Sequence, residues 1–163
     1  MFRRTIRVAV FAVCTSLAAP VAAQDYNVGL EAARRGDYAT ALENWQPLAE
    51  QGYASAQYSL GYVYNNGQGV PQDYAEALRW YRLAAEQGDA SAQNNLGSMY
   101  ENGQGVPQDY IMAHIWLNLA SANGSKKGGE WRDKVAAKMT PADISEAQRR
   151  ARVCMSSGYE DCD

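Results

Sequence analysis

The nine-residue sequence NGQGVPQDY occurs twice, at residues 66–74 and again at residues 102–110. Glycines beside an amide and a carboxylate are residue types that can cradle a phosphate group. A nucleotide-binding loop, however, leaves a strand and enters a helix with GxGxxG or GxxxxGK[ST] spacing. Here Gln72 stands where the third glycine belongs, and no Lys follows. We therefore interpret both copies as turns between paired helices and predict no nucleotide cofactor.

Few other residues are candidates for chemistry. A Ser, Cys or Thr nucleophile needs a base beside it, and His114 is the single histidine. It replaces Leu78 of the preceding repeat on the inner side of a helix, so we expect a partly buried, hydrogen-bonded structural histidine. The chain has no Ser-x-x-Lys, no HExxH and no paired Cys/His set, and we expect Glu160 and Asp161 to be solvated. We predict no catalytic residue, no metal site and no cofactor, so that the chain is not an enzyme.

Residues 1–23 have the pattern of a cleaved secretory signal peptide. Three arginines precede a short apolar stretch, and small residues at 21–23 precede Gln24. The stretch is shorter than the ~20 residues that span a bilayer. We expect cleavage around Gln24, no membrane insertion afterwards, and a periplasmic or secreted protein. Cleavage would leave 140 residues with 12 Lys and Arg against 18 Asp and Glu, an acidic single domain ill suited to binding nucleic acid or anionic membranes.

Cys154 and Cys162 are the two cysteines that remain after residue 23. In one continuous helix their Cα atoms would lie ~12 Å apart, beyond the ~7 Å that a disulfide tolerates. A bridge therefore requires the chain to fold back near Ser156 to Gly158, and Gly158 suits a helix C-terminus. Two cysteines in an exported chain most often pair. The alternatives are two free thiols or a metal pair.

The two nine-residue copies belong to a longer repeat. Residues 53–88 and 89–124 are identical at 21 of 36 aligned positions, and residues 24–52 form an earlier, shorter unit. A fixed period of this size indicates an array of stacked supersecondary units. No β-strand pattern accompanies the repeat, so the predicted fold class is all-α.

Each unit is predicted to be a helical hairpin. Gly61 in the first helix permits close approach of a neighbour, and Asp73 is positioned to cap the second helix. Apolar residues of that second helix recur at helical spacing on one face: Tyr74, Ala77, Leu78, Tyr81, Ala84 and Ala85. The shorter unit has a first helix at about 25–35 and lacks the GQGVPQ loop.

The repeat pattern stops after Gly124. We expect a flexible joint at 124–129, then helices at about 130–139 and 141–157, the second starting at Thr140-Pro141. These would cap the last repeat. The predicted organisation is a signal peptide at 1–23, three hairpins at 24–52, 53–88 and 89–124, and a C-terminal helical cap at 125–163 containing the candidate disulfide.

The motifs A-x-A-Q-x-x-L-G-x-x-Y, G-x-G-V-x-x-D-Y and A-x-x-W, as they stand in residues 54–80 and again in the next repeat, resemble those of Sel-1-like repeat proteins, relatives of tetratricopeptide repeats. The first unit is similar to a tetratricopeptide repeat, and residues 139–154 resemble segments that follow such repeats in exported bacterial proteins. The resemblance implies a right-handed α/α solenoid of stacked hairpins. It also implies a scaffold or adaptor that binds other proteins, in bacteria often in envelope processes.

A cysteine-rich branch of that family has a disulfide in each repeat, and some of its members have been proposed to bind or hydrolyse β-lactams. No repeat contains a Cys here. An enzyme that binds or hydrolyses a β-lactam or a cell-wall fragment is therefore kept as the alternative function.

A partner-binding groove is predicted from first-helix positions that differ between the repeats. Positions 58, 62 and 65 share one helical face, and 94, 98 and 101 are their equivalents in the next repeat. Tyrosines and amides are effective contact residues, although the tyrosines could instead pack between hairpins. The candidate contact residues are Tyr26, Tyr58, Tyr62, Asn65, Asn94, Ser98 and Glu101.

The sequence thus favours a non-catalytic scaffold of the bacterial cell envelope that binds a partner protein or peptide along a concave groove. The partner's identity is not encoded in these patterns. End-to-end self-association of the solenoid is a further possibility.

Overall fold

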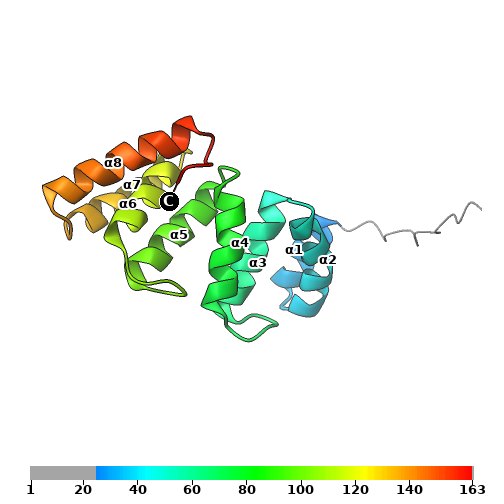
Figure 1. Cartoon of the computed structure of the whole chain (residues 1–163). Helices are drawn as coiled ribbons and strands as arrows, with labels where there is room; N and C mark the ends of the chain where they lie inside the picture. Colours follow the sequence, from blue (N-terminus) through cyan, green and yellow to red (C-terminus); the bar gives the residue numbers. More distant parts are fainter. Residues whose placement is uncertain (1–24, 163) are drawn as a thin grey trace, which may run out of the picture.

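The computed structural model describes residues 25–162, which form eight helices and no strand (Figure 1). The helices follow one another along an α/α solenoid, as predicted. Their bounds are α1 Tyr26–Arg34, α2 Tyr38–Glu50, α3 Ala54–Asn66, α4 Tyr74–Ala85, α5 Ala90–Asn102, α6 Tyr110–Ala122, α7 Lys126–Ala136 and α8 Pro141–Ser156. The predicted signal peptide at residues 1–23 lies outside the described residues.

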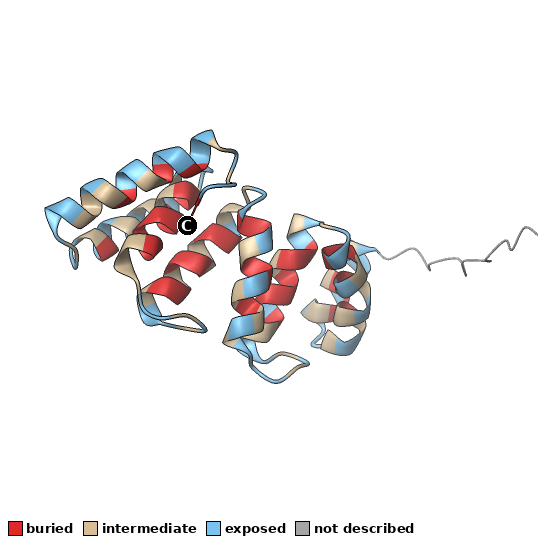
Figure 2. Ribbon diagram, viewed as in Figure 1, coloured by how far each residue is buried: buried red, intermediate tan, exposed pale blue. Residues whose placement is uncertain are grey.

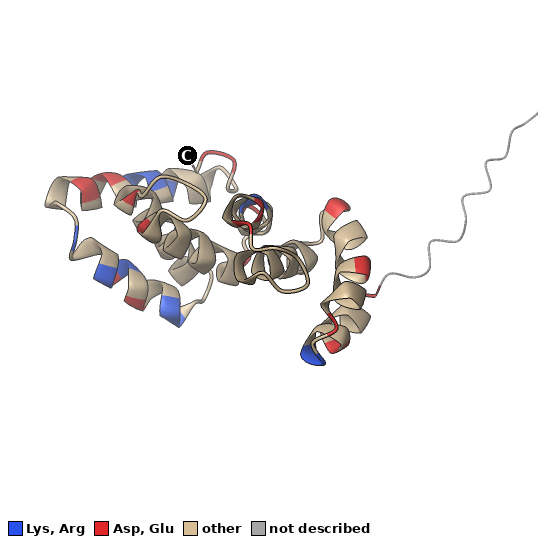
Figure 3. Ribbon diagram, turned by 90° about the horizontal axis from the view of Figure 1, so that it is seen from below, with Lys and Arg blue, Asp and Glu red and all other residues tan. Residues whose placement is uncertain are grey.

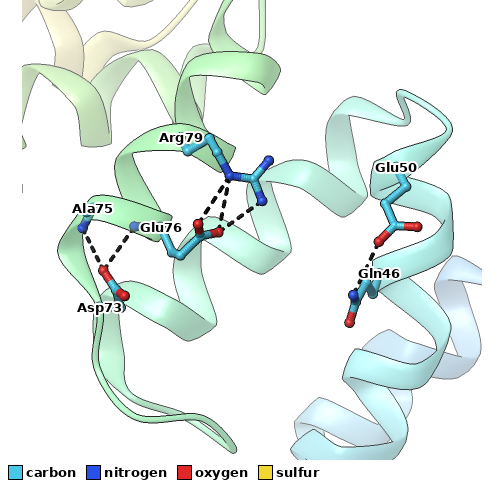
Figure 4. Close-up of polar contacts among 6 residues, drawn as sticks. All are labelled: Gln46, Glu50, Asp73, Ala75, Glu76 and Arg79. Atoms are coloured by element: carbon cyan, nitrogen blue, oxygen red, sulfur yellow. Dashed lines mark hydrogen bonds and ion pairs between the residues drawn. The ribbon is translucent and has the colours of Figure 1, made fainter.

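Aspartates begin most of these helices. Asp73 accepts hydrogen bonds from the backbone N–H groups of Ala75 and Glu76, at 2.9 and 3.0 Å (Figure 4). A carboxylate at this position satisfies N–H groups that have no partner within the helix. The predicted cap is confirmed, and the same role falls to Asp25, Asp37, Asp89 and Asp109.

A glycine in each first helix sets the packing of each hairpin. A Cβ added to Gly61 would lie 2.5 Å from the Tyr81 ring, and one added to Gly97 would lie 2.5 Å from Cγ of Leu117. Gly29 stands in the same relation to Trp45. The large side chain of the second helix therefore packs directly on the backbone of the first. Gly61 permits the close approach that the sequence predicts.

The duplicated nine-residue segments are loops between paired helices. Gly67 and Gly103 end α3 and α5 in the left-handed conformation, which glycine adopts at little cost. A Cβ on Gly105 would meet the Tyr74 carbonyl oxygen at 2.5 Å. Each loop therefore packs on the start of the preceding hairpin's second helix, and the segment is architecture in both copies.

Buried amides tie successive hairpins together. Gln57 donates a hydrogen bond to the Ala49 carbonyl at 3.0 Å and accepts one from Gln87 at 2.7 Å. Gln93 makes the equivalent bonds one repeat later, to the Ala85 carbonyl and from Asn123. A buried amide with both ends satisfied fixes the stacking of two hairpins at little net cost.

Two apolar cores lie along the solenoid (Figure 2). The smaller core joins α1, α2 and α3 around Trp45 and Leu60, together with Trp80 of α4. The larger core joins α4 to α8 and contains most of α6, including Trp116. Figure 2 shows the buried residues on the sides of the helices that face their neighbours.

The prediction of a flexible joint at 124–129 is wrong, because α7 already begins at Lys126. Ser125 caps this helix by accepting a hydrogen bond from the backbone N–H of Gly128. A Cβ on Gly128 would lie 2.9 Å from Cβ of Ala120 in α6 and 3.0 Å from the backbone nitrogen of Ser121. The glycines therefore let α7 pack closely on α6.

The second cap helix, α8, starts at Pro141 as predicted, with Thr140 as its N-cap. Both cap helices pack on α6. After Ser156 the chain folds back through Gly158, and Cys154 and Cys162 form a disulfide with their Cα atoms 4.5 Å apart. Tyr159 then reaches Asn123, and the two side chains exchange hydrogen bonds of 2.8 and 3.0 Å.

Candidate functional site

The first helices present equivalent residues on one side of the solenoid, which we call the inner face: the side lined by α1, α3, α5 and α7. The 36-residue period carries Tyr62 onto Ser98 and, one period further, onto Lys134 of α7. In the shorter first unit Gly29 takes the place of Gly61, so Leu30 is the equivalent of Tyr62. Two clefts open on this face.

The first, the tyrosine cleft, has a volume of about 290 Å³ and lies between α1 and α3. It is mostly aromatic and aliphatic, and its only charged side chain is that of Arg34. Its lining residues are Tyr26, Leu30, Ala33, Arg34, Tyr38, Trp45, Tyr58, Ser59, Tyr62 and Val63.

The first helices of successive hairpins make few direct backbone contacts with one another, and α1 and α3 make the fewest. The hydroxyl groups of Tyr26 and Ser59 bridge the gap with a hydrogen bond of 3.2 Å. Trp45 supports Tyr26 from α2 by donating a hydrogen bond to its backbone carbonyl, also at 3.2 Å. The walls are thus held apart by large side chains at fixed positions.

Two of the predicted contact tyrosines differ in burial. Tyr58 is half-buried and packs on Tyr81 with a ring-centroid distance of 5.8 Å. Burial raises the pKa of Tyr58, and a hydrogen bond with Asn95 opposes that rise. Tyr62 is 45% exposed. Tyr58 therefore combines packing between helices with a place in the cleft wall, while Tyr62 offers its ring to solvent.

The second, the polar cleft, has a volume of about 230 Å³ and lies between α5 and α7. Ser98 and Glu101 line it together with Asn102, Trp131 and Lys134. Glu101 makes an ion pair of 2.8 Å with Lys138, and the hydrogen bond it accepts raises the pKa of that ammonium group. Lys127 lies over the Trp131 ring, 4.1 Å from its centroid.

The structure therefore divides the predicted contact residues into groups. Tyr26, Tyr58 and Tyr62 come together in the tyrosine cleft, and Ser98 and Glu101 in the polar cleft. Asn65 lines neither cleft; its backbone carbonyl accepts a hydrogen bond from Gln72 of the loop. Asn94 is half-buried and donates a hydrogen bond of 2.6 Å to Ser125 at the start of α7.

Sequence reasoning missed Arg34, Trp131 and Lys134 as cleft residues. The last two follow from extending the 36-residue period beyond Gly124, a signal obscured by the glycines at 128 and 129. Arg34 carried no comparable signal. It reaches the cleft from the last turn of α1 and corresponds in the register to Asn66 and Asn102, which are identical in the two longer repeats and so gave no signal of divergence.

The residues considered for chemistry are not arranged as an active site. His114 is 2% exposed, and its Nδ1 atom has no hydrogen-bond partner among the described residues. Burial, assisted by the charge of Arg132, lowers its pKa. It is thus more deeply buried than expected, and the expected hydrogen bond is not formed at Nδ1. Both cysteines are bonded to each other, which settles the choice left open by the sequence.

Residues 25–162 contain no cluster of three or more His, Cys, Asp or Glu side chains that could hold a metal ion. In the same range no helix combines the length and apolar character needed to cross a membrane.

Comparison with known proteins gives a consistent result. The model of the Sel1 repeat family matches residues 23–53, 54–89 and 90–125. No curated protein sequence is significantly similar to this chain.

Two solved structures are similar to it. A protective antigen present in uropathogenic Escherichia coli strains, which displays an SLR fold, is 31% identical over 82% of this chain with a TM-score of 0.77. The chain spans 30% of that protein's length. A Sel1 repeat protein from Oxalobacter formigenes is 34% identical, with a TM-score of 0.60, over 68% of this chain and 90% of its own.

Sel1 repeats commonly mediate protein–protein interaction, and their scaffolds are generally non-catalytic. Three matched repeats and an all-helical solenoid place this protein among them: the chain belongs to the Sel1 repeat family.

Proposed function

We propose that this protein is an exported, non-catalytic adaptor of the bacterial cell envelope that binds a partner protein through its inner face. The observation that carries the proposal is the tyrosine cleft between α1 and α3. The partner would insert an apolar side chain there and continue along the face toward the polar cleft.

The cleft has the properties of an interaction hot spot. Aromatic residues with hydroxyl tips supply contact area and hydrogen bonds together, and they are enriched where partners bind tightly. The exposed ring of Tyr62 is available without refolding, because the fold already holds α1 and α3 apart. A preformed cleft reduces the entropic cost of binding.

Export is supported by two independent features. The first 23 residues carry the charge, apolar stretch and small-residue pattern of a secretory signal. The Cys154–Cys162 disulfide is a bond that persists in oxidising compartments. Mass spectrometry of the protein purified from fractionated cells tests this proposal: a mature chain starting at Gln24 in the periplasm or medium is expected, and an uncleaved cytoplasmic chain would contradict it.

A non-catalytic role is supported by the burial of His114, since a general base must reach the proton it abstracts. The β-lactam alternative gains no support from the described residues. Turnover of a chromogenic β-lactam by the mature protein, retained in a His114→Leu variant and lost in a cleft variant, would nevertheless establish an enzyme.

Site-specific photo-crosslinking in cells tests the adaptor proposal. A photoreactive phenylalanine analogue replaces Tyr62 in the tyrosine cleft, and in a matched protein it replaces Gln148, which is exposed on α8 outside both clefts. We expect one reproducible protein adduct from position 62 and none at the same mass from position 148.

A second arm uses Tyr26→Ala to remove one wall of the cleft while the photoreactive group stays at position 62. The adduct is expected to weaken. Equal adducts from positions 62 and 148, or no adduct at normal expression, would refute the adaptor role on this face.

A further inference from the structure

The two clefts of the inner face each contain an exposed cation. Arg34 lies in the tyrosine cleft, near one end of the solenoid, and Lys134 lies in the polar cleft, near the other. Lys134 makes no ion pair with any described residue. Arg34 pairs with Glu31 on the same helix, and the two side chains are 64% and 56% exposed. Exposed ion pairs of this kind contribute little to stability. A carboxylate of a partner can therefore take the place of Glu31.

Most of the negative charge of the repeats lies away from these clefts. Residues 25–124 contain 11 Asp and Glu against 4 Lys and Arg. Five of the eleven are the helix-capping aspartates, whose carboxylates are bound to backbone N–H groups. Figure 3 shows Lys and Arg concentrated in α7 and α8.

Glu101 is the one acidic side chain that lines either cleft, and Lys138 neutralises it. The inner face therefore presents a cation near each end although the repeats as a whole are acidic.

The apolar surface of the inner face is also localised, in the tyrosine cleft. The tyrosine cleft of about 290 Å³ is near the lower limit for a small-molecule site and suits one or two inserted side chains. Helices in packing contact lie roughly 8–10 Å apart, so the three steps from α1 to α7 cover at least about 25–30 Å. An extended segment of about nine residues covers that distance.

We propose that the inner face binds an extended acidic peptide segment, with one apolar side chain in the tyrosine cleft and carboxylates at Arg34 and Lys134. The inference rests on the proposed function and specifies the chemistry of the partner. The acidic composition of the repeats, taken alone, would instead attract a basic partner.

Three fluorescein-labelled peptides of about nine residues test it by fluorescence anisotropy. The first carries Phe near one end and Asp residues spread along a Gly/Ser background. The second replaces each Asp with Lys, and the third replaces Phe with Ala. We expect the acidic Phe peptide to bind about tenfold more tightly than the Lys peptide at low salt, with the difference shrinking as salt is added. The Ala peptide is expected to bind weakly.

Charge-reversal variants locate the effect. Arg34→Glu and Lys134→Glu should each reduce the preference for the acidic peptide, and the double variant should favour the Lys peptide. Arg152→Glu makes the same change in net charge on exposed α8, outside both clefts, and should leave the preference unchanged. Circular dichroism is expected to show unaltered helix content in all four variants.

Equal binding of the Asp and Lys peptides, or no binding of either, overturns the inference. An equal loss in Arg152→Glu overturns it too, because net charge would then be responsible. These outcomes are separate from the crosslinking result. An adduct at position 62 without a preference for the acidic peptide would keep the adaptor role and reject this partner chemistry, whereas absence of the adduct would reject the adaptor role itself.

Discussion

The tyrosine cleft and the polar cleft occupy equivalent places in the repeat register but have different chemistry. Leu30 and Tyr62 of the first correspond to Ser98 and Lys134 of the second, and Ser59 corresponds to Trp131. In both places the two first helices make few direct backbone contacts, and the side chains between them line the cleft. The repeat thus fixes where a cleft forms, and the positions that diverge between repeats decide what it can bind.

The second helices behind the clefts differ for a related reason. Glu76 and Arg79 of α4 form an ion pair in solvent (Figure 4). Their equivalents in α6 are Met112 and Ile115, which are 6% and 0% exposed. The two cap helices pack on α6 and exclude water from it. The polar cleft therefore stands on the larger core, and the tyrosine cleft on the smaller one.

The largest effect is expected from Gly97→Val, which tests whether the polar cleft depends on that larger core. The new side chain would collide with Leu117, since even a Cβ lies 2.5 Å from its Cγ atom. We expect a loss of about 3 kcal/mol in the free energy of unfolding, measured by urea denaturation. Ser91→Ala, exposed on the same helix, is the control. A loss no larger than the control's would mean that the two helices separate easily.

Removal of the disulfide should destabilise the helices beside the polar cleft and leave those around the tyrosine cleft unchanged. On the chain-entropy model, the disulfide that closes the loop between Cys154 and Cys162 stabilises the folded protein by about 2.5 kcal/mol. Reduction during unfolding should lower the stability by that amount, and a double Cys→Ser variant should not respond to reductant. Hydrogen exchange should accelerate in α7 and α8 but not in α1 to α3. Faster exchange in α1 would show that the clefts are coupled.

Alanine substitutions of two tyrosines in the tyrosine cleft should distinguish a residue that packs in the fold from one that is free to contact a partner. Tyr58→Ala loses the ring contact with Tyr81 and half-buried surface, and should cost about 1.5 kcal/mol. Tyr62→Ala, at an exposed position, should change stability by less than about 0.5 kcal/mol. Thermal and urea unfolding of both variants provide the measurement. Equal losses would show that Tyr62 is a core residue as well.

His114→Leu restores the residue type of the preceding repeat, where Leu78 stands. It removes a buried Nδ1 atom without a partner among the described residues, so a gain of about 1 kcal/mol is expected at neutral pH. Because burial lowers the folded-state pKa of His114, the unfolded chain binds the proton more readily, and the wild-type protein loses stability as pH falls below about 6.5. The variant should lose less stability between pH 7 and pH 5. Parallel pH profiles would assign the acid sensitivity to other groups.

The smallest effect is expected at the rim of the polar cleft. Lys138→Ala breaks the ion pair with Glu101, but the Lys138 side chain is 50% exposed. Such pairs contribute little to stability, so the thermal midpoint should stay within experimental error. The binding preference for acidic peptides should fall, because Glu101 would lose its counter-charge. A large drop in the midpoint would show that this pair holds the cap in place.

Much of the fold could be predicted because its signals are local and repeated. The helical spacing from Tyr74 to Ala85, the Asp73 cap and the glycine at position 61 each act within a few residues of their own position. A second copy of each signal one period later confirmed the pattern. The placing of Tyr26 beside Tyr58 and Tyr62 also followed from the register alone.

The errors arose where the same residue types serve another purpose. Glycines 128 and 129 indicate flexibility when read alone, yet at position 128 the missing side chain is what lets α7 approach α6. Because of that misreading, the repeat signal at Trp131 and Lys134 was missed. Asn94 was also predicted to contact a partner, whereas its side chain donates a hydrogen bond to Ser125.

The sequence by itself determined the repeat, the hairpins, their caps and the residues that diverge between equivalent positions. Local hydrogen bonding and side-chain periodicity govern those features, and both depend on residues that are close together in the sequence. Only the tertiary structure decided that a mainly apolar cleft opens between α1 and α3, that α7 packs closely on α6, and that Arg34 lies in the tyrosine cleft. Those outcomes depend on how large and small side chains from different helices fit together, and no stretch of the chain contains that information alone.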